Sequence, residues 1–383
     1  MIPRRSPWES LSDSSRRLAL EVLRHGPLAR TELAERLDLS AASLTRLTKP
    51  LLDGGLLHEL QNSPAHGGGR PLQPLEVDSD AQQFVGIKLA ADEAYGVLTT
   101  LRADIVSTAT VRIDARDPAS IIEALTSLVG TLAPAHHPAA IGVALGGDVK
   151  DFTLVRRAPF LDWHDINLGR LFTQHCGLPV VVSNDLDALT EAEHWFGAGR
   201  GVQSFAQLTI GTAVGSGLVI HDRLVTGPDS GIGPLGHFPL DPLGPQCALG
   251  HRGCADVMLS TSSILAQATI LLGRYVTYEE VLDLAASGDP LASKIVGRSA
   301  YAFGTLIAAI ANIAQPQRIL LSGEGIRLAR VGHDYLWAGI AQSRQPDASA
   351  LDVRILEDDP QRWARGASAV AIQRTVLAKL PRL

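Results

Sequence analysis

The sequence predicts an α/β protein, with an N-terminal winged helix-turn-helix domain at residues 1–78 and a larger two-lobed α/β body at residues 82–383. Three observations support this fold class. A helix–turn–helix pattern with a Gly-rich hairpin opens the chain, strands then alternate with helices, and the composition is typical of globular proteins. With 383 residues, 45% of them hydrophobic and 19% charged, the chain can bury more than one core.

The composition excludes membrane-spanning proteins and disulfide-rich secreted proteins. No uninterrupted apolar run approaches the roughly 18 residues of a membrane span, and the N-terminal segment lacks the apolar core of a signal peptide. The three cysteines are too few for a disulfide framework. We therefore expect a cytoplasmic protein that has no membrane partner.

The net charge of −6 is unevenly distributed along the chain. Residues 1–77 carry ten Lys/Arg and nine Asp/Glu, whereas the remaining residues carry 24 and 31. Between Arg16 and Lys49 there are seven basic and four acidic residues. This asymmetry favours a front domain that binds a polyanion, although a solvated surface would show a similar excess.

Three helices are expected in the front domain. The first has an apolar stripe that begins after Arg16 and ends before Gly26-Pro27. Thr31 is predicted to cap a short second helix and Ser40 to cap the third, with a tight turn at Asp38-Leu39 between them. Residues off the Leu stripe of the third helix can face a major groove. We expect DNA contacts from Thr31, Ser40, Ala41, Ser43, Thr45, Arg46 and Lys49.

Two short strands around a Gly-rich tip are predicted next and form the wing of the domain. Gly69 and Arg70 lie at this tip, from which a cation can enter a minor groove. A small helical oligomerisation domain would share the Leu stripe. It would explain neither the glycines beside Arg70 nor the absence of acidic residues from Leu39 to Leu52. The sequence therefore predicts a domain that binds double-stranded DNA.

The body begins with three consecutive strands over residues 83–113, followed by a helix at 121–134 and buried strands at 139–145 and 178–185. Two strands joined by a glycine turn follow at residues 205–227, and long helices dominate after residue 262. This order predicts two α/β lobes with a ligand cleft between them. We place the first lobe at about 82–183 plus the C-terminal helix 364–383, and the second lobe at about 184–363.

Three stretches of the body could carry chemistry. Asn184-Asp185 follows a buried strand, where an amide and a carboxylate can hydrogen-bond a polyol, although either residue could simply cap a helix. Gly211–Gly217 lets the backbone approach an anion, although a tight hairpin has the same spacing. The third stretch, Gly231–Cys254, contains Cys247, Cys254, His237 and His251 and is either a metal-binding loop or a Gly/Pro-rich connection without metal.

Taken in order, these motifs resemble the ROK family (repressors, open reading frames and sugar kinases) over nearly the whole chain. "VGIKLAAD" at 85–92 and "TIGTAVGSGLVIHDRLVTG" at 209–227 are similar to the two phosphate loops of the family. "IGVALGGDV" at 141–149 resembles its sugar loop, 161–201 its Asn-Asp region, 231–256 its His and Cys motifs, and "PQRILLSGEGI" its adenine-side segment. The resemblance implies an actin-like, sugar-kinase-like, ATPase-type fold, and the winged helix implies the repressor branch.

The first phosphate loop departs from the kinase pattern of the family. Lys88 replaces an Asp, Ala90 and Ala91 replace two glycines, and Asp92 replaces a Thr. The added Cβ atoms block close backbone approach, and Asp92 would repel a phosphate. We therefore expect no ATP and no catalysis. Asp185 matches the kinase base, but as a vestige that accepts a hydrogen bond from a ligand hydroxyl.

The resemblance also implies the residues that bind the ligand. Pro234 replaces a sugar-binding Glu and Asp256 replaces a second, longer one, so each altered contact costs about 1–3 kcal/mol for the usual sugar. The pocket is therefore expected to bind a different sugar, a sugar phosphate, another metabolite, or nothing. The expected ligand-binding residues are Gly146, Gly147, Asn184, Asp185, His237 and Asp256.

For the cysteine-containing loop, the resemblance implies a structural zinc site of one His and three Cys. His237, Cys247 and Cys254 occupy three of these positions, and Leu249 replaces the remaining Cys. Because structural zinc prefers four N or S ligands, we hypothesise that His251 completes a His2Cys2 set. The alternative is a loop with free thiols and no metal.

Together these features predict a DNA-binding transcriptional regulator, a repressor of sugar or secondary metabolism. Its effector is expected to be a sugar or a sugar-derived molecule, bound between the two lobes of a non-catalytic kinase-like body. Paired operator half-sites require a homodimer or homotetramer. Two alternatives are a ROK sugar kinase with an added DNA-binding domain, and a ligand-independent regulator with a degenerate pocket.

Overall fold

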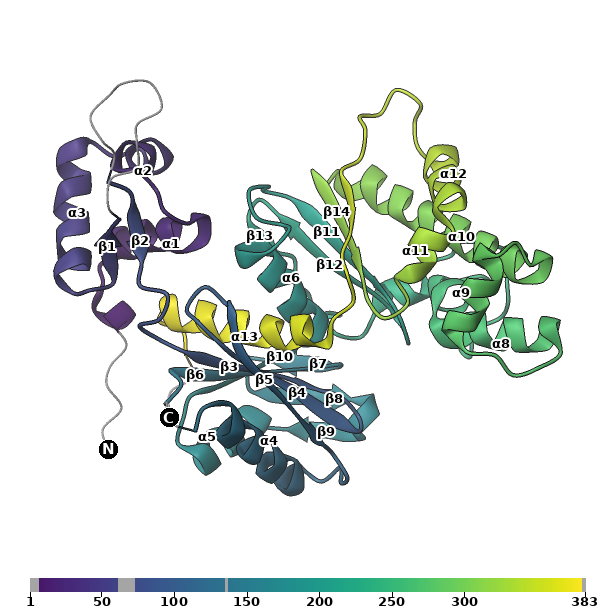
Figure 1. Cartoon of the computed structure of the whole chain (residues 1–383), viewed down its shortest axis with the longest axis horizontal. Coiled ribbons are helices and arrows are strands. Elements are labelled where there is room, and N and C mark those ends of the chain that lie inside the picture. Colours follow the sequence, from purple (N-terminus) through teal and green to yellow (C-terminus); the bar gives the residue numbers. More distant parts are fainter. Residues whose placement is uncertain (1–6, 61–72, 135–136, 381–383) are drawn as a thin grey trace. The chain divides into compact units, whose positions relative to one another are not determined.

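The computed structural model describes residues 7–60, 73–134 and 137–380 (Figure 1). Their contacts divide the chain into two units, Met1–Gly201 with Pro360–Leu383, and Val202–Asp359. We had expected the second lobe to begin at about residue 184. Helix α6 (Asp185–Phe196) instead groups with the first unit, because it packs on the C-terminal helix α13 (Pro360–Val376) and on strands of the first sheet.

The N-terminal part of the first unit is a helical domain with a two-stranded sheet, and we call it the head. It comprises η1 (Pro7–Ser10), α1 (Asp13–His25), α2 (Arg30–Leu37), α3 (Ala41–Asp53), β1 (Leu57–Glu59) and β2 (Leu75–Val77), with the two strands antiparallel. Apolar side chains from all three helices bury one core around Trp8, Leu18 and Leu33. The helix–turn–helix and the start of a wing are therefore present as predicted.

The helix caps of the head agree with the prediction at α3 and differ from it at α2. Ser40 caps α3 by accepting a hydrogen bond from the Ser43 amide at 3.3 Å. The residue before α2 is Ala29, and the prediction that Thr31 caps this helix is wrong. Leu28 forms a two-way backbone bridge with Leu75 of β2, at 3.0 and 2.8 Å, and Ala29 remains extended, so α2 begins only at Arg30.

The lobe of the first unit is built on a five-stranded sheet of order β10-β6-β3-β4-β5. The predicted meander is β3 (Phe84–Leu89), β4 (Glu93–Thr99) and β5 (Ile105–Arg112), while β6 (Ala140–Leu145) and β10 (Val180–Asn184) run parallel to β3. Helices α4 (Pro118–Leu132) and α5 (Leu168–Cys176) share a core with one face. A small antiparallel sheet contains β7 (Asp148–Lys150), β8 (Leu154–Ala158) and β9 (Trp163–Ile166), and the short 3-10 helix η2 (Pro159–Leu161) connects β8 to β9.

Helix α13 lies directly on the face of the five-stranded sheet opposite α4 and α5 (Figure 1). A Cβ added at Gly86 would come within 2.1 Å of the Ala364 carbonyl oxygen, and one at Gly142 within 1.9 Å of the Ala367 carbonyl oxygen. No side chain fits between helix and strand at these two places. The two glycines therefore allow the closest approach that the backbones can make.

The second unit contains a five-stranded sheet of order β13-β12-β11-β14-β15. Its strands are β11 (Phe205–Ile210), β12 (Val214–Ile220), β13 (Arg223–Leu224), β14 (Arg318–Ser322) and β15 (Val353–Ile355). Its helices are η3 (Pro234–His237), α7 (Ala255–Leu259), α8 (Thr261–Leu272), α9 (Tyr278–Ala286), α10 (Pro290–Ala314), α11 (Arg327–Val331) and α12 (His333–Ser343). Ala206, Leu208 and Ile210 of β11 pack with α10 in one core.

By length and composition, helix α10 could cross a membrane, although the sequence has no uninterrupted apolar run of that length. In the structure 67% of its most apolar stretch is buried. Phe303, Leu306 and Ile307 are fully buried in the core of the second unit. The helix therefore serves as the central core helix of this unit.

Candidate functional site

The Asn184 side chain joins the end of β10 to the start of α6. Its Oδ1 accepts hydrogen bonds from the amides of Leu186 at 2.9 Å and Asp187 at 3.1 Å, as an N-cap does. Its Nδ2 donates to the Gly147 carbonyl at 3.0 Å. Asn184 therefore caps α6 and also ties this helix to the turn between β6 and β7.

Gly146 and Gly147 form that turn and lie beside Asp185. A Cβ at Gly147 would come within 2.2 Å of the Arg157 carbonyl oxygen, so only glycine fits there. A Cβ at Gly146 would lie 3.5 Å from Asp185 Oδ2. Four of the six predicted ligand-binding residues are thus gathered at one edge of the first sheet.

Lys88 on β3, which was not among the predicted ligand-binding residues, forms an ion pair with Asp185. The Lys88 ammonium also lies 5.3 Å from the centroid of the Trp363 ring. The two ion-paired side chains are only 17% and 18% exposed. Asp185 Oδ1 accepts a hydrogen bond from the Leu186 amide at 2.9 Å, so both oxygens of this carboxylate have partners. The sequence identified Lys88 as an obstacle to nucleotide binding but missed its pairing with Asp185.

Asp187 lies one residue further along α6 and is half-buried. Burial, followed by the negative charges of Asp185 and Glu191, raises the pKa of Asp187 to about 6. A polyol site needs groups that both donate and accept hydrogen bonds. A carboxyl that titrates close to neutral pH can do either.

In the second unit, the glycine loop between β11 and β12 is in contact with a carboxylate of the same unit. The backbone amide of Thr212 donates to Glu324 Oε1 at 2.5 Å, and the Thr212 hydroxyl donates to the same oxygen at 2.6 Å. Glu324 stands between Gly323 and Gly325 after β14. A phosphate held by this loop would need the donors that Glu324 now takes. A charged residue between two glycines was the sequence feature that could have indicated this contact, and it was not recognised as such.

Asp256, in the first turn of α7, binds the other end of the glycine loop. Its Oδ1 accepts a hydrogen bond from the Val214 amide at 2.9 Å. A Cβ at Gly236 would come within 2.5 Å of Asp256 Oδ2, so the turn that carries His237 lies directly against this carboxylate. The two predicted ligand-binding residues of the second unit, His237 and Asp256, are therefore neighbours.

His237, Cys247 and Cys254 form a cluster whose candidate ligand atoms all lie within 4.8 Å of one another. The His237 Nδ1 atom is 3.9 Å from the Cys247 sulfur and 3.7 Å from the Cys254 sulfur. Burial opposes ionisation of the Cys247 thiol, but hydrogen bonds from the backbone amides of Leu249 and His251 outweigh it and lower the pKa of this thiol. One imidazole and two thiols are a donor set that suits zinc.

His251 lies next to this cluster but its nitrogens are outside it. The rings of His251 and His237 have centroids 5.1 Å apart and meet edge to face. The backbone of Cys247 donates to the His251 carbonyl at 2.8 Å, which holds the two residues across a tight hairpin. Leu249, at the tip of this hairpin, is 68% exposed. The structure therefore gathers three of the four predicted metal ligands.

Most of the predicted DNA-contacting residues at α2 and α3 are exposed on the head. Thr31, Ser40, Ala41, Thr45, Arg46 and Lys49 are exposed, and Ser43 is half-buried beside the Ser40 cap. Leu44 and Leu51 point into the core on the other side of α3. The predicted wing residues Gly69 and Arg70 lie outside the described residues.

Comparisons with known proteins agree with this architecture. The chain is 28% identical over 363 residues to the DNA-binding transcriptional repressor Mlc of Escherichia coli (strain K12), which covers 90% of this chain and 88% of Mlc. The crystal structure of a ROK family transcriptional regulator, a homolog of E. coli Mlc, matches 96% of this chain and 98% of its own at 26% identity, with a TM-score of 0.81.

Sugar kinases of known structure match only about three quarters of this chain. The ROK hexokinase from Thermus thermophilus is 25% identical, has a TM-score of 0.65, and covers 75% of this chain but 97% of its own. A sequence model of the ROK family matches residues 84–373, which begin just after the head and include the candidate site residues of each unit. This protein therefore belongs to the ROK family.

Proposed function

We propose that this protein is a transcriptional repressor that binds operator DNA through its head and responds to a sugar or sugar-derived effector without phosphorylating it. The observation that carries the proposal is the Lys88–Asp185 ion pair in a chain that also has an exposed helix α3. The carboxylate that would serve a kinase as its base is neutralised, while the surface for reading DNA is present. The similarity to Mlc over both regions supports the same conclusion.

Two separate contacts support the proposed lack of kinase chemistry. Phosphoryl transfer needs a base that is free to accept the substrate proton and a loop that holds the phosphates. Asp185 is paired with Lys88, and the donors of Thr212 are bonded to Glu324. Each contact by itself removes one requirement of the reaction. The alternative function, a ROK sugar kinase with an added head, would need both contacts to break.

The effector is proposed to bind the polar groups that the resemblance to the family indicates. Asn184, Asp185, Gly146 and Gly147 belong to the first unit, and His237 and Asp256 belong to the second. The altered polar groups at Pro234 and Asp256 favour a ligand other than the unmodified sugar of the kinases. A sugar, a sugar phosphate or a related metabolite fits this chemistry.

A structural zinc is proposed at His237, Cys247 and Cys254, with His251 as the fourth ligand. The short distances among the first three donors support it. The closeness of the His251 ring to His237 supports the completion of the set. A zinc bound there would cross-link the hairpin of Cys247 to the His237 turn, which in turn lies against Asp256.

The DNA contacts are proposed to come from Thr31, Ser40, Ala41, Ser43, Thr45, Arg46, Lys49, Gly69 and Arg70. Two heads would be required for two half-sites, so we propose a homodimer or a homotetramer. The composition supports a cytoplasmic protein.

The proposal is tested by selecting operator duplexes from a random library with the purified full chain. The bound duplexes are then released with a panel of sugars and sugar phosphates, and ATP consumption is measured with the same panel. Selective release without ATP consumption is the expected result. Sugar phosphorylation that is lost in Asp185→Asn would support the kinase alternative. A selected duplex that no panel member releases would favour the ligand-independent regulator.

A further inference from the structure

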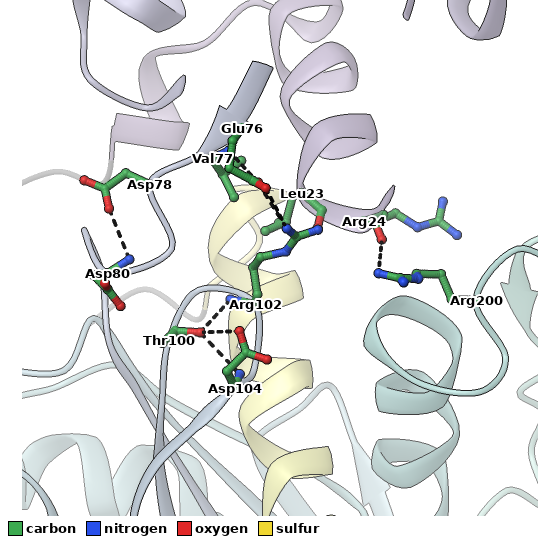
Figure 2. A network of polar contacts seen from close by, with 10 residues as sticks. All are labelled: Leu23, Arg24, Glu76, Val77, Asp78, Asp80, Thr100, Arg102, Asp104 and Arg200. Atoms are coloured by element: carbon green, nitrogen blue, oxygen red, sulfur yellow. Dashed lines mark hydrogen bonds and ion pairs between the residues drawn. The ribbon is translucent and has the colours of Figure 1, made fainter. Parts of the chain in front are cut away.

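Arg102 extends from the turn between β4 and β5 into the head (Figure 2). Its Nη1 lies 3.1 Å from each carboxylate oxygen of Glu76 on β2. Its Nη2 donates to the Leu23 carbonyl, in the last turn of α1, at 3.1 Å. One guanidinium thus holds both a helix and the base of the wing strand.

The contact between Arg102 and Glu76 is largely shielded from solvent. The side chains of Arg102 and Glu76 are only 18% and 15% exposed. The planar guanidinium offers several donors at fixed angles, so it can satisfy a carboxylate and a helix carbonyl together. The C-terminal end of a helix also carries partial negative charge, which favours a cation there.

The turn that carries Arg102 is fixed from both sides. The Thr100 hydroxyl oxygen accepts from the amides of Arg102 and Asp104 at 3.2 Å each, as Figure 2 shows. Ala103 adopts a left-handed φ of +58°, and its carbonyl accepts from Arg365 Nε of α13 at 2.7 Å. Hydrogen bonds within the turn and to α13 therefore hold the backbone at Arg102 in place.

A second contact meets α1 one residue further on. Arg24 Nη2 lies 3.2 Å from His194 Nε2, and the Arg24 guanidinium lies 5.5 Å from the centroid of the Trp195 ring. The Arg24 carbonyl also faces Arg200 (Figure 2). His194 and Trp195 are in the last turn of α6, the helix that begins at Asp185.

Helix α6 therefore has the candidate ligand residues at one end and the head at the other. Its 12 residues span about 18 Å at the rise of an α-helix. Because an α-helix shifts as a unit, a displacement of Asn184 or Asp185 is passed to His194 and Trp195 with little loss. The two contacts with α1, at Leu23 and at Arg24, are adjacent along the chain.

We infer that the C-terminal end of α1 is the junction through which the lobe sets the orientation of the head, with Arg102 as the positioning residue and α6 as the route from the ligand residues. The inference rests on the proposed function, because it treats the head as the DNA-reading part. It adds a specific residue and a specific helix for the coupling between ligand and DNA.

The first test compares Arg102→Ala, Arg102→Lys and Glu76→Gln in the full chain. The control is Arg112→Ala, on the same hairpin, where the pair with Asp114 is 84% and 86% exposed. Binding is measured against the operator duplex that the wild-type chain selects, at about 150 mM salt. Loss of the guanidinium should weaken operator binding by about tenfold or more, whereas Lys, which keeps one contact, should restore part of it. The control should stay within about twofold.

Hydrogen exchange provides a readout that needs neither DNA nor effector. Arg102→Ala and Glu76→Gln should both speed amide exchange in α1 and β2 while leaving exchange in α10 unchanged. Asp185→Asn should alter exchange in α1, and this effect should disappear when His194→Ala is added. A wild-type chain that selects no operator would reject the proposed function alone. Unchanged exchange in α1 in all of these variants would overturn the junction.

Failure of the junction can still be distinguished from failure of the proposed function if one variant misfolds. Should Arg102→Ala fail to give a cooperative thermal transition, Glu76→Gln decides, because it removes the ion pair with almost no change of shape. Wild-type operator affinity and wild-type exchange in a folded Glu76→Gln would reject Arg102 as a positioning residue.

Discussion

Lys88 on β3 and Asp185 at the start of α6 form an ion pair at the edge of the first sheet, and both side chains are largely buried. Replacing Lys88 by Met leaves the Asp185 charge partly buried without its partner, and we expect the free energy of unfolding to fall by about 1–3 kcal/mol. Adding Asp185→Asn to Lys88→Met should recover part of the loss. Urea denaturation of the single and double variants measures both effects, and equal stability of Lys88→Met and wild type would show that the pair has no energetic role.

Glu324 should keep phosphates out of the second glycine loop. We predict that pyrophosphate at about 10 mM leaves the melting temperature of the wild type unchanged, because the Thr212 donors are already bonded. In Glu324→Gly these donors are released, so pyrophosphate should raise the melting temperature. Thr212→Val in the same background removes the hydroxyl donor but keeps the backbone amide, so it should reduce the gain. A clear pyrophosphate shift in the wild type would contradict the role given to Glu324.

The cysteine-containing loop should hold about one zinc per chain after purification without added metal. Cys254→Ser should release the metal, since it removes a buried donor, and His251→Ala should weaken its retention against a chelator. Leu249→Cys should strengthen retention by supplying the thiol found in the family pattern. Elemental analysis gives the content directly, and less than about 0.2 equivalents in the wild type would exclude the site.

Arg46 is expected to contact the phosphate backbone or a base edge of the operator. Arg46→Ala should weaken binding by about 1–3 kcal/mol and should lower the slope of log affinity against log salt by about one if the contact is to phosphate. Arg70→Ala should weaken binding through the wing. Lys150→Ala, at an exposed position on β7, is the matched control. Titration of labelled operator at several salt concentrations measures both quantities, and parent-like binding by both Arg variants would reject these contacts.

Asp187 should make stability depend on pH in a definite direction. Its folded-state pKa of about 6 is above the ordinary value of 3.8, so the folded state binds more protons between these values. Its contribution to the free energy of unfolding therefore falls as pH rises from about 4 to 6. Asp187→Asn should be more stable than wild type by about 1–3 kcal/mol at pH 7–8, and the difference should vanish near pH 4. Denaturation across this range decides the matter, and a constant difference would refute it.

Local patterns in the sequence predicted the elements that short segments determine. The Leu stripes gave the three helices of the head, and the alternation over residues 83–113 gave the meander. Ser40 was predicted as a cap because its hydroxyl needs only the amide three residues later. Thr31 was misplaced because the start of α2 is set by the Leu28–Leu75 bridge, which joins segments far apart in the chain.

Local sequence patterns could not predict the contacts that decide the chemistry of the site, because these contacts join distant segments. Lys88 and Asp185 are separated by 97 positions, and Thr212 and Glu324 by 112. Motif positions indicated which residues were unusual, but only the register of the strands brings each pair together. The same holds for Arg102, whose neighbours Leu23 and Glu76 belong to the head.

The seating of α13 on Gly86 and Gly142 has a consequence for biosynthesis. The face of the sheet that β3 and β6 form stays uncovered until Pro360–Val376 has been translated, because that helix is its direct cover. Ala371, Ile372 and Val376 of the same helix also belong to the cluster that contains the apolar core of the head. A nascent or truncated chain that ends within Val202–Asp359 therefore lacks the part of this apolar cluster that α13 supplies.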